Sequence, residues 1–507
     1  MKKSLKDRMT LHPLMTMLIL IFITILLSGF LSLLGVQVTY DKINMDMLEY
    51  SPETITIKNL LSLGGLKYIF TSTLANFAAF TPLSSLIIML IGIGVMEKSG
   101  FLKTAFTILT KKAKKTSVTF AVVLISILAS LIGDLSFVIL IPISALLFEY
   151  GKRNPNIGII ASFAGLTCGQ GLSLFLTSID STMLSTSLLG AHLLDKSYTA
   201  GTMSFILIMI IAIILISILI TKITEEKIAK ILPKYEFAET EIEEDLAIGR
   251  KELKGLIFGL GAGILYLLIF IYNIIPGLPF SGNFLDNSQT FYIDKLFSYD
   301  SFFSNGFVFI VTMLFIILGF FYGLGARTIK NNKDLCDDFG HSLDGIGNTM
   351  VLIFFASILI NVFKYSNIGT VIVAGLTNII GSVNFSAIPL ILLLFVIAVI
   401  STIVLPSSIA RWAITGGVAV PVLMNAGVSP EFTQVVYRFG ECMTLGLTPL
   451  FAYFVIYLAY LEKYNQSNKP INLFRTIKYQ LPYSLTTGGV LLLLIIVWYI
   501  IGFPVGF

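Results

Sequence analysis

The fold is decided by residues 401–464, which read STIVLPSSIARWAITGGVAVPVLMNAGVSPEFTQVVYRFGECMTLGLTPLFAYFVIYLAYLEKY. The apolar runs of this stretch are long enough to enter a bilayer, but Pro, Gly, Arg and Glu interrupt them repeatedly. Such interruptions are costly in lipid unless the broken backbone lines a hydrated cavity enclosed by protein. We therefore interpret the stretch as the substrate site of a membrane transporter.

The whole chain has the composition of a polytopic membrane protein. Of its 507 residues, 56% are hydrophobic and only 12% are charged, which excludes an ordinary soluble globular protein. The net charge of +5 comes from basic residues in short loops, where they report topology and indicate no nucleic-acid partner. The three cysteines and three histidines are isolated along the chain, so we expect no disulfide framework, no zinc site and no cofactor.

Hydrophobic runs and basic loops predict an all-α polytopic membrane protein with about nine transmembrane helices and two re-entrant hairpins. Lys2, Lys3, Lys6 and Arg8 place the N-terminus in the cytoplasm. Residues 40–53 are expected to form an acidic external loop, and 98–115 and 463–478 are expected to form basic cytoplasmic loops. The predicted spans are 12–36, 80–96, 157–189, 203–220, 256–274, 307–324, 346–363, 431–460 and 491–501, and the hairpins are 117–150 and 388–424.

The order span, amphipathic segment, hairpin and broken span occurs twice, with opposite direction across the membrane. This order predicts an inverted repeat, and inverted repeats with discontinuous helices are typical of secondary transporters that bind substrate near the membrane midplane. The predicted regions are an N-terminal span with an external segment (1–77), a first repeat with its return span (78–221), a cytoplasmic acidic linker (222–254), a scaffold helix pair (255–345), a second repeat (346–464), and a cytoplasmic loop with the last span (465–507).

Two arginines are predicted at membrane depth in the second repeat. Arg411 lies beside the hairpin tip, and Arg438 lies in the broken span that follows. A charge in this position is costly unless it meets water, a counter-charge or a ligand, and the planar guanidinium suits a carboxylate or sulfonate. The alternative is a buried ion pair, for example between Arg438 and Glu441, which are three residues apart on one helix face.

The carboxylates of Asp180 and Glu441 are the candidates for ion coupling, one in each broken span. A carboxylate there can bind Na⁺ together with freed backbone carbonyls, or can carry a proton when it is desolvated. Apart from such a Na⁺ site, we expect no metal. The alternative for Asp180 is a helix cap, and the alternative for Glu441 is the intrahelical pair with Arg438.

Polar side chains also mark the two hairpin tips. Asp134 and Ser136 at the first tip are further candidates for ion coupling, and Ser407 and Ser408 at the second are candidates for substrate binding. Both tips lie next to helix N-termini that favour anions. Ordinary capping of the returning helices explains them equally well. Trp412 either stacks on an aromatic ligand or packs within the hairpin.

Three stretches resemble the AbgT family of bacterial p-aminobenzoyl-glutamate transporters: TPLSSLIIMLIGIGVMEKSGFL, VILIPISALLFEYGKRNPNIGIIASFAG and ARWAITGGVAVPVLMNAGVSPEFTQVVYRFGE. The resemblance extends over about residues 60–464. It implies a homodimer in the bacterial inner membrane whose protomers have nine transmembrane helices and two hairpins. It also implies inward movement of p-aminobenzoyl-glutamate, or export of sulfonamide antimetabolites, coupled to a Na⁺ or H⁺ gradient.

The same resemblance assigns functional roles to specific positions, and this chain departs from the family at several others. Where the family commonly has Asp, Ser, Asn and Lys, this chain has Glu441, Ile409, Thr402 and Arg411. These departures concern the identity of the substrate more than the transport class. The family's functional residues correspond here to Asp180, Trp412, Pro430, Arg438 and Pro449.

Other functions fit the pattern less well. A Na⁺-coupled carrier of another organic anion, such as a dicarboxylate, would use the same hairpin plan. An ion channel would show a polar stripe through several helices, whereas the polar residues here cluster at two tips and two breaks. A hydrolase would need a catalytic constellation, and neither hairpin nor broken span contains a histidine. The sequence therefore predicts a transporter and no enzyme.

Overall fold

The computed structural model describes residues 11–44, 48–175, 177–201, 203, 205–237, 248–290, 292–297, 301–467 and 469–506. The basic residues 2–8 and most of the acidic run 236–245 lie outside these ranges. The orientation and the linker role that they suggest stay predictions.

Within the described residues, nine helical segments are long and apolar enough to cross a membrane. Their number matches the prediction, but their membership differs. The set includes α5 and α18, which we expected as hairpin arms, and omits the two predicted broken spans, whose pieces are too short. The segments are α1 (Pro13–Leu33), α2 with α3 (Leu63–Ala78 and Thr81–Lys98), α5 with η2 (Lys115–Leu128 and Ala129–Ile132), α9 (Ile206–Ile223) with its extension to Ile231, α12 (Arg250–Ile274), α14 (Phe302–Ala326), α16 (Gly347–Ser366), α18 (Ala387–Val404) and α22 (Leu473–Ile501).

The first predicted hairpin forms a helix pair with its turn at the expected tip. Helix α5 continues into η2, and α6 (Leu135–Tyr150) returns after Gly133, whose φ of 63° favours glycine. Both α5 and α6 pack on α7 (Pro155–Gly169). Whether this pair is re-entrant in a membrane stays a prediction.

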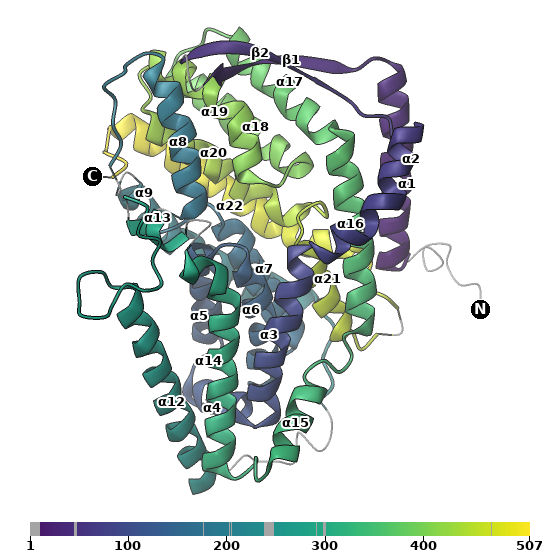
Figure 1. Ribbon diagram of the computed structural model, residues 1–507, viewed down its shortest axis with the longest axis vertical. Coiled ribbons are helices and arrows are strands. Elements are labelled where there is room, and N and C mark those ends of the chain that lie inside the picture. The colour runs from purple at the N-terminus through teal and green to yellow at the C-terminus, as the bar shows by residue number, and fades with distance from the viewer. Residues whose placement is uncertain are drawn as a thin grey trace.

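The second predicted hairpin forms a matching pair, α18 and α19 (Ser408–Asn425). Helix α18 packs on α20 (Pro430–Thr444), and α19 packs on α20 and on α8 (Ser178–His192). These helices lie together in the upper part of Figure 1. The first pair lies on α7, the last helix before one break, and the second pair meets α20, the last helix before the other.

Both predicted broken spans are interrupted. Helix α7 ends at Gly169 and α8 begins at Ser178, while α20 is followed by η4 (Leu445–Leu447) and then by α21 (Phe454–Lys463). The second break begins after Thr444, where α20 ends. Gly440 lies inside α20, where an added Cβ would stand 2.6 Å from the Ala398 Cβ on α18. This glycine allows close helix packing instead of unwinding.

Residues 40–44 and 49–53, which were expected in a loop, form strands of an antiparallel two-stranded sheet, and their external position stays a prediction. Strands β1 (Gln37–Asn44) and β2 (Glu49–Thr56) pair with Tyr40 opposite Glu53. Val38 and Tyr40 alternate with polar residues at the start of β1, as in a strand with one covered face, but the alternation ends at Lys42. The sheet packs on α17 (Ile368–Ser382) and α19 across the top of Figure 1. Burial, and then the Glu53 carboxylate, raise the pKa of Tyr40 to about 12.

Several expected polar loops are partly helical. The basic segment 98–115 contains α4 (Phe101–Lys112), and α15 (Asn332–His341) follows α14. The last helix, α22, begins at Leu473, well before the predicted 491. The predicted span 491–501 is too short to cross a bilayer, whereas α22 is long enough. The expected linker 222–254 contains the end of α9, the π-helical turn η3 (Thr224–Ile228), α10 (Ala229–Ile231) and the start of α12. A further short helix, α13 (Tyr292–Phe297), precedes α14.

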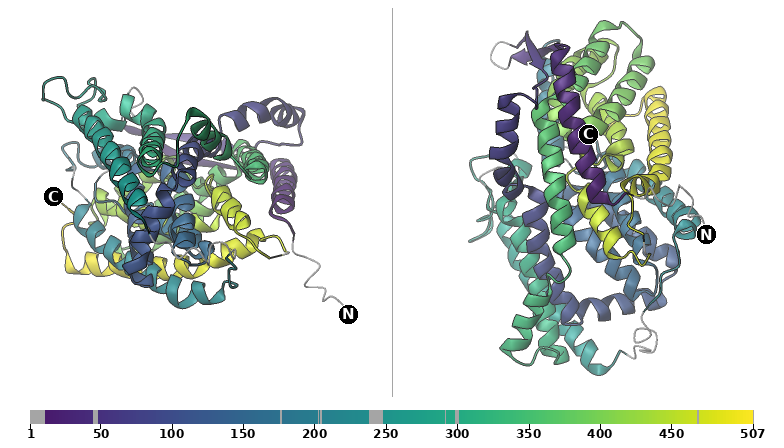
Figure 2. Two further views of the ribbon diagram at one scale, coloured as in Figure 1. Left: turned by 90° about the horizontal axis from the view of Figure 1, so that it is seen from below. Right: turned by 90° about the vertical axis from the view of Figure 1, so that its right-hand side faces the viewer.

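The core is built around α7, α20 and α21, whose residues are almost all buried. Helices α1 and α16 lie side by side on one flank (Figure 2). Helix α12 lies at the edge of the molecule, where it packs mainly on α14 and exposes most of its apolar surface (Figure 1). Helices α7, α20 and α21 are therefore enclosed by protein, whereas the outer helices present apolar surface suited to lipid.

Candidate functional site

Helix α20 carries two opposite charges through the protein interior. Arg438 and Glu441 are three residues apart, so both lie on one face of the helix. Their side chains are only 2% and 1% exposed. Arg438 Nη1 lies 2.8 Å from Glu441 Oε2, so the intrahelical pair considered from the sequence is present.

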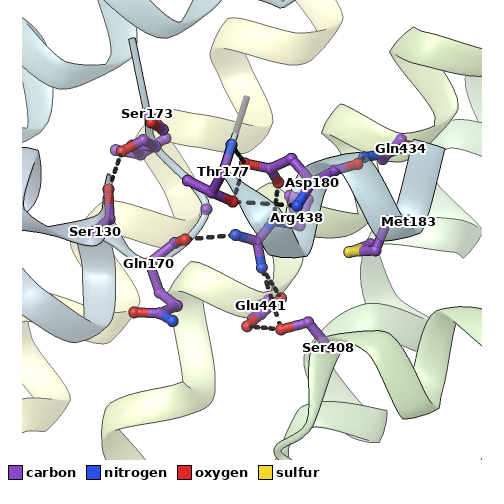
Figure 3. A network of polar contacts seen from close by, with 12 residues as sticks. Ser130, Gln170, Ser173, Thr177, Asp180, Met183, Ser408, Gln434, Arg438 and Glu441 are labelled. Carbon is purple, nitrogen blue, oxygen red and sulfur yellow. Dashed lines mark hydrogen bonds and ion pairs between the residues drawn. The ribbon is translucent and has the colours of Figure 1, made fainter. Parts of the chain in front are cut away.

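Arg438 connects α20 to three other segments (Figure 3). Its Nε lies 3.0 Å from Asp180 Oδ1 on α8, and its Nη2 donates to the backbone carbonyl of Gln170 at 2.5 Å, directly after α7. Its Nη1 also donates to Ser408 Oγ at 3.1 Å, at the start of α19. A guanidinium offers five N–H donors in a fixed plane, which lets one side chain hold all these partners.

Glu441 pairs with both buried arginines. Its Oε2 lies 3.1 Å from Arg411 Nη2, and its Oε1 accepts a hydrogen bond of 2.5 Å from Ser408 Oγ. Arg411 is fully buried, donates from Nη1 to Thr402 Oγ1 and lies 5.7 Å from the centre of the Tyr437 ring. Arg411 is thus an internal cation that joins the two arms of the second helix pair to α20.

The network is electrically balanced. The two arginines are matched by two carboxylates, Asp180 and Glu441, and all four side chains are less than a tenth exposed. The cavity that Asp180 lines has a volume of only about 10 Å³. In this conformation the arginines are therefore engaged by protein groups, and a carboxylate ligand would have to displace one of the two internal carboxylates.

Asp180 forms the helix cap that was its alternative role and also pairs with Arg438, whereas ion coupling stays a prediction. It is the third residue of α8, and its Oδ2 accepts from the Thr177 hydroxyl at 2.7 Å and from the Thr177 backbone N–H at 3.3 Å. The Thr177 hydroxyl in turn accepts from the Asp180 N–H, which completes a capping box. The other oxygen of Asp180 meets Arg438. One carboxylate therefore starts the helix after the break and neutralises the arginine of the other half.

Trp412 is enclosed in the same region. The side chain is fully buried, and its indole N–H donates to the Met183 carbonyl at 3.0 Å and to Ser187 Oγ at 3.1 Å, both on α8. Its ring lies 4.8 Å from the Tyr437 ring, and an added Cβ at Gly416 would stand 2.7 Å from it. These contacts explain Trp412 by packing, and stacking on a ligand stays a prediction.

Gln170 and Gln434 are network residues that the sequence did not single out. The Gln170 side chain donates to Asp134 Oδ1 at 3.3 Å, while its own carbonyl accepts from Arg438. Gln434 donates to the Asp180 carbonyl at 3.1 Å and accepts from Ser187 at 2.8 Å. Each is a polar amide within a mainly apolar stretch, and Gln170 also lies between two glycines. This contrast is the sequence signal that could have identified both.

The remaining predicted residues lie outside the charged network. Ser136 Oγ donates to the Gly133 carbonyl at 2.7 Å, and Ser407 Oγ accepts from the Ala410 N–H at 3.4 Å, so both serve their helix starts. Pro430 is the first residue of α20, about two turns from Arg438. Pro449 follows η4 in the second break, and Ile409 is 41% exposed. Substrate contacts of these residues stay predictions.

Among the described residues, side chains that commonly bind metals do not cluster. Across the described ranges, no group of three or more His, Cys, Asp or Glu residues is placed to hold a metal ion. Cys168 and Cys442 are buried, and Cys336 is exposed.

Comparison with known proteins gives consistent matches over nearly the whole chain. Residues 7–507 match the family described as "AbgT putative transporter family". The chain is 25% identical over 496 residues to the p-aminobenzoyl-glutamate transport protein of Escherichia coli (strain K12), which covers 98% of this chain and 93% of that protein.

Two solved structures are similar over the same extent. One is MtrF from Neisseria gonorrhoeae, described as illuminating a class of antimetabolite efflux pumps, with 27% identity, a TM-score of 0.50, and coverage of 98% of this chain and 97% of MtrF. The other is the YdaH transporter from Alcanivorax borkumensis, with 26% identity, a TM-score of 0.49, and coverage of 98% and 100%.

Proposed function

This chain belongs to the AbgT family of transporters, and on that premise we propose that it is an ion-coupled carrier of p-aminobenzoyl-glutamate-like aromatic carboxylates or an exporter of sulfonamide antimetabolites. The E. coli relative is named for p-aminobenzoyl-glutamate transport, and MtrF is described among antimetabolite efflux pumps. Both descriptions refer to the transport of small organic molecules.

The observation that carries this proposal is the position of Arg438 between the two broken helices. Its partners belong to α8, to the segment after α7, to the start of α19 and to α20 itself. A relative movement of the two halves must therefore exchange some of these contacts. A guanidinium that loses an internal carboxylate becomes available to a carboxylate or sulfonyl group of the substrate.

The charge balance supports the proposed ion coupling. When an anionic substrate takes Arg438, the displaced Asp180 or Glu441 carboxylate is left without its cation in a region of low dielectric constant. An uncompensated buried carboxylate is unstable, so it gains from a proton or a Na⁺ ion. Asp180 and Glu441 are thus the proposed ion-coupling groups, and Arg438 and Arg411 are the proposed groups for the substrate anion.

The finer properties of the carrier belong to the same proposal. The apolar outer helices favour a multi-pass protein of the bacterial inner membrane, and the basic N-terminus favours a cytoplasmic start. A homodimer rests on the family resemblance. A Na⁺-coupled carrier of another organic anion, such as a dicarboxylate, is the alternative, since Glu441, Thr402, Ile409 and Arg411 differ from the common family residues.

Transport in reconstituted vesicles tests the proposal. Wild-type protein should accumulate p-aminobenzoyl-glutamate or a sulfonamide when a H⁺ or a Na⁺ gradient is imposed, with each gradient tested separately and simple dicarboxylates added as competitors. Arg438→Gln should abolish this flux, whereas Arg475→Gln, at an exposed arginine of α22, should not. Equal flux through wild type and Arg438→Gln would refute the site, and flux that ignores both gradients would refute ion coupling.

A further inference from the structure

A cavity lies beside the tip of the first helix pair and outside the charged network. Its volume is about 470 Å³, and it is lined by Asp134 and Leu135 of that tip together with residues of other helices. This volume lies within the range of ~300–1,000 Å³ typical of small-molecule sites. Asp134 is exposed, whereas the carboxylates of the network are buried. The cavity can therefore admit a ligand without first breaking the arginine pairs.

The polar lining offers several hydrogen-bond acceptors, and it also contains the hydroxyls of Thr81 and Tyr453, which can donate or accept. Besides Asp134, the lining includes Asn76 and Asn361. The Asn361 amide nitrogen donates to the Ser357 carbonyl at 2.8 Å, and that of Asn76 donates to the Tyr68 hydroxyl at 3.2 Å, so the amide oxygens are the groups that can accept. Among the described residues of the lining there is no Lys, Arg or His. Such a wall suits an N–H donor and repels a carboxylate.

The rest of the lining is largely apolar and partly aromatic. It includes Phe80, Pro82, Val308 and Tyr453. Aromatic and aliphatic side chains of this kind bind a flat ring by dispersion and edge or face contacts. The cavity therefore combines a ring-binding wall with a single carboxylate, and within the described residues that carboxylate forms no ion pair.

Asp134 is also connected to the charged network by one residue. Gln170 donates from its side chain to Asp134 Oδ1 and accepts at its backbone carbonyl from Arg438. A ligand that competes for Asp134 therefore acts on the same residue that holds Arg438. This connection gives the cavity a structural route to the proposed transport site.

We propose that this cavity binds the arylamine end of the cargo, with the amine donating to Asp134, the ring against the apolar wall and the carboxylates directed away from Asp134. This assignment rests on the proposed function and deepens it, because the p-aminobenzoyl group is an arylamine. The same geometry accepts the aminophenyl ring of a sulfonamide. Asp134 thus selects for the amine, whereas the arginines act on the acidic end.

Matched ligands with and without the amine test the assignment. Equilibrium binding to the purified full-length protein is measured for p-aminobenzoyl-glutamate and for benzoyl-glutamate, which lacks only the amine. A hydrogen bond to a charged group predicts that wild type prefers the amino compound by about 10- to 100-fold. Asp134→Ala should remove this preference by weakening the amino compound alone. Asp195→Asn, at an exposed carboxylate in the loop after α8, should leave the preference intact.

A labelling experiment provides a second readout that does not depend on the Asp134 variant folding. Val308→Cys is introduced in a Cys336→Ser background, since Cys336 is the exposed native thiol and Cys168 and Cys442 are buried. p-Aminobenzoyl-glutamate should slow modification of the introduced thiol by a small maleimide, and benzoyl-glutamate at the same concentration should protect much less.

The outcomes separate the two proposals. The cavity assignment is overturned if wild type binds both compounds equally, if Asp134→Ala keeps the preference, or if the amino compound does not protect the thiol. Asp134-dependent binding in a wild-type protein that transports neither compound into vesicles would leave the cavity assignment standing and overturn the proposed function.

Discussion

The two broken helices contribute opposite halves of one charge network. The first break supplies acceptors, namely the Gln170 carbonyl before the gap and the Asp180 carboxylate after it. In the second half, Arg438 and Glu441 both lie in α20, before the helix ends at Thr444. Interrupted backbone and buried charge are therefore separate features. In the first half the polar groups lie on either side of the helix break. In the second half the charged residues lie within an unbroken helix.

The difference suggests how the halves depend on each other. The first half contributes two hydrogen-bond acceptors, the Gln170 carbonyl and the Asp180 carboxylate. The second half places the Arg438 guanidinium within reach of both. Neither half neutralises its own charges completely, because Glu441 alone faces two arginines in the second half. Removing a charge from one side should therefore destabilise the other.

The largest effect is expected for Arg438→Gln. This change leaves Asp180 and Glu441 with one arginine between them, and breaking a buried pair by removing one partner costs about 3–5 kcal/mol. Unfolding of the detergent-solubilised protein measures the loss. A change of less than about 1 kcal/mol would show that the pairs behave like surface salt bridges.

A smaller loss is expected for Asp180→Asn, because asparagine keeps most of the cap and only one arginine contact is lost. We expect about 3 kcal/mol, at the low end for a broken buried pair. Thr177→Ala is the matched control, since it removes the cap without removing the charge and should cost about 1 kcal/mol. Equal losses in both variants would mean that Asp180 acts only as a helix cap.

Ser408→Ala probes the contact between α19 and α20. The Ser408 hydroxyl donates to Glu441 and accepts from Arg438, so its removal should cost about 1–2 kcal/mol. The effect should shrink markedly in a Glu441→Gln background, because a neutral amide is a weaker acceptor than a carboxylate. An unchanged cost in that background would assign Ser408 to local helix structure.

The smallest effect is expected at the outer sheet. Tyr50 donates its hydroxyl to the Gly417 carbonyl at 3.1 Å, and that carbonyl lacks its helical partner because residue 421 is proline. Tyr50→Phe should cost about 1 kcal/mol and should accelerate amide hydrogen exchange in α19 more than in α6, which also contains an internal proline and packs on α7. Uniform exchange would show that the sheet does not restrain α19.

Much of this arrangement could be predicted from the sequence, because hydrophobic length and misplaced charge are local signals. Long apolar runs predicted the outer helices, and Asp180, Arg438 and Glu441 were recognised as costly at membrane depth. The sequence left a functional role and an ion pair or helix cap as alternatives for these residues. The structure contains the pair and the cap, and the functional roles stay proposals.

Other features could not be predicted, because they depend on which distant groups face each other. The Thr402 hydroxyl beside Arg411 and the bridge through Gln170 require the packed helices. The sheet of β1 and β2 was missed because short polar strands have no strong pattern. The enclosure of Trp412 by α8 also depends on packing between the two halves, which hydrophobic periodicity does not report.

The central claim is that Asp180 and Arg438 act as one unit across the two halves, and a double-mutant cycle tests it most directly. The unfolding free energies of Asp180→Asn, Arg438→Gln and the double variant are measured in detergent. Because the double variant leaves Arg411 paired with Glu441 and restores neutrality, it should be more stable than Arg438→Gln alone, with a coupling energy above about 1 kcal/mol. Strictly additive losses would contradict the account.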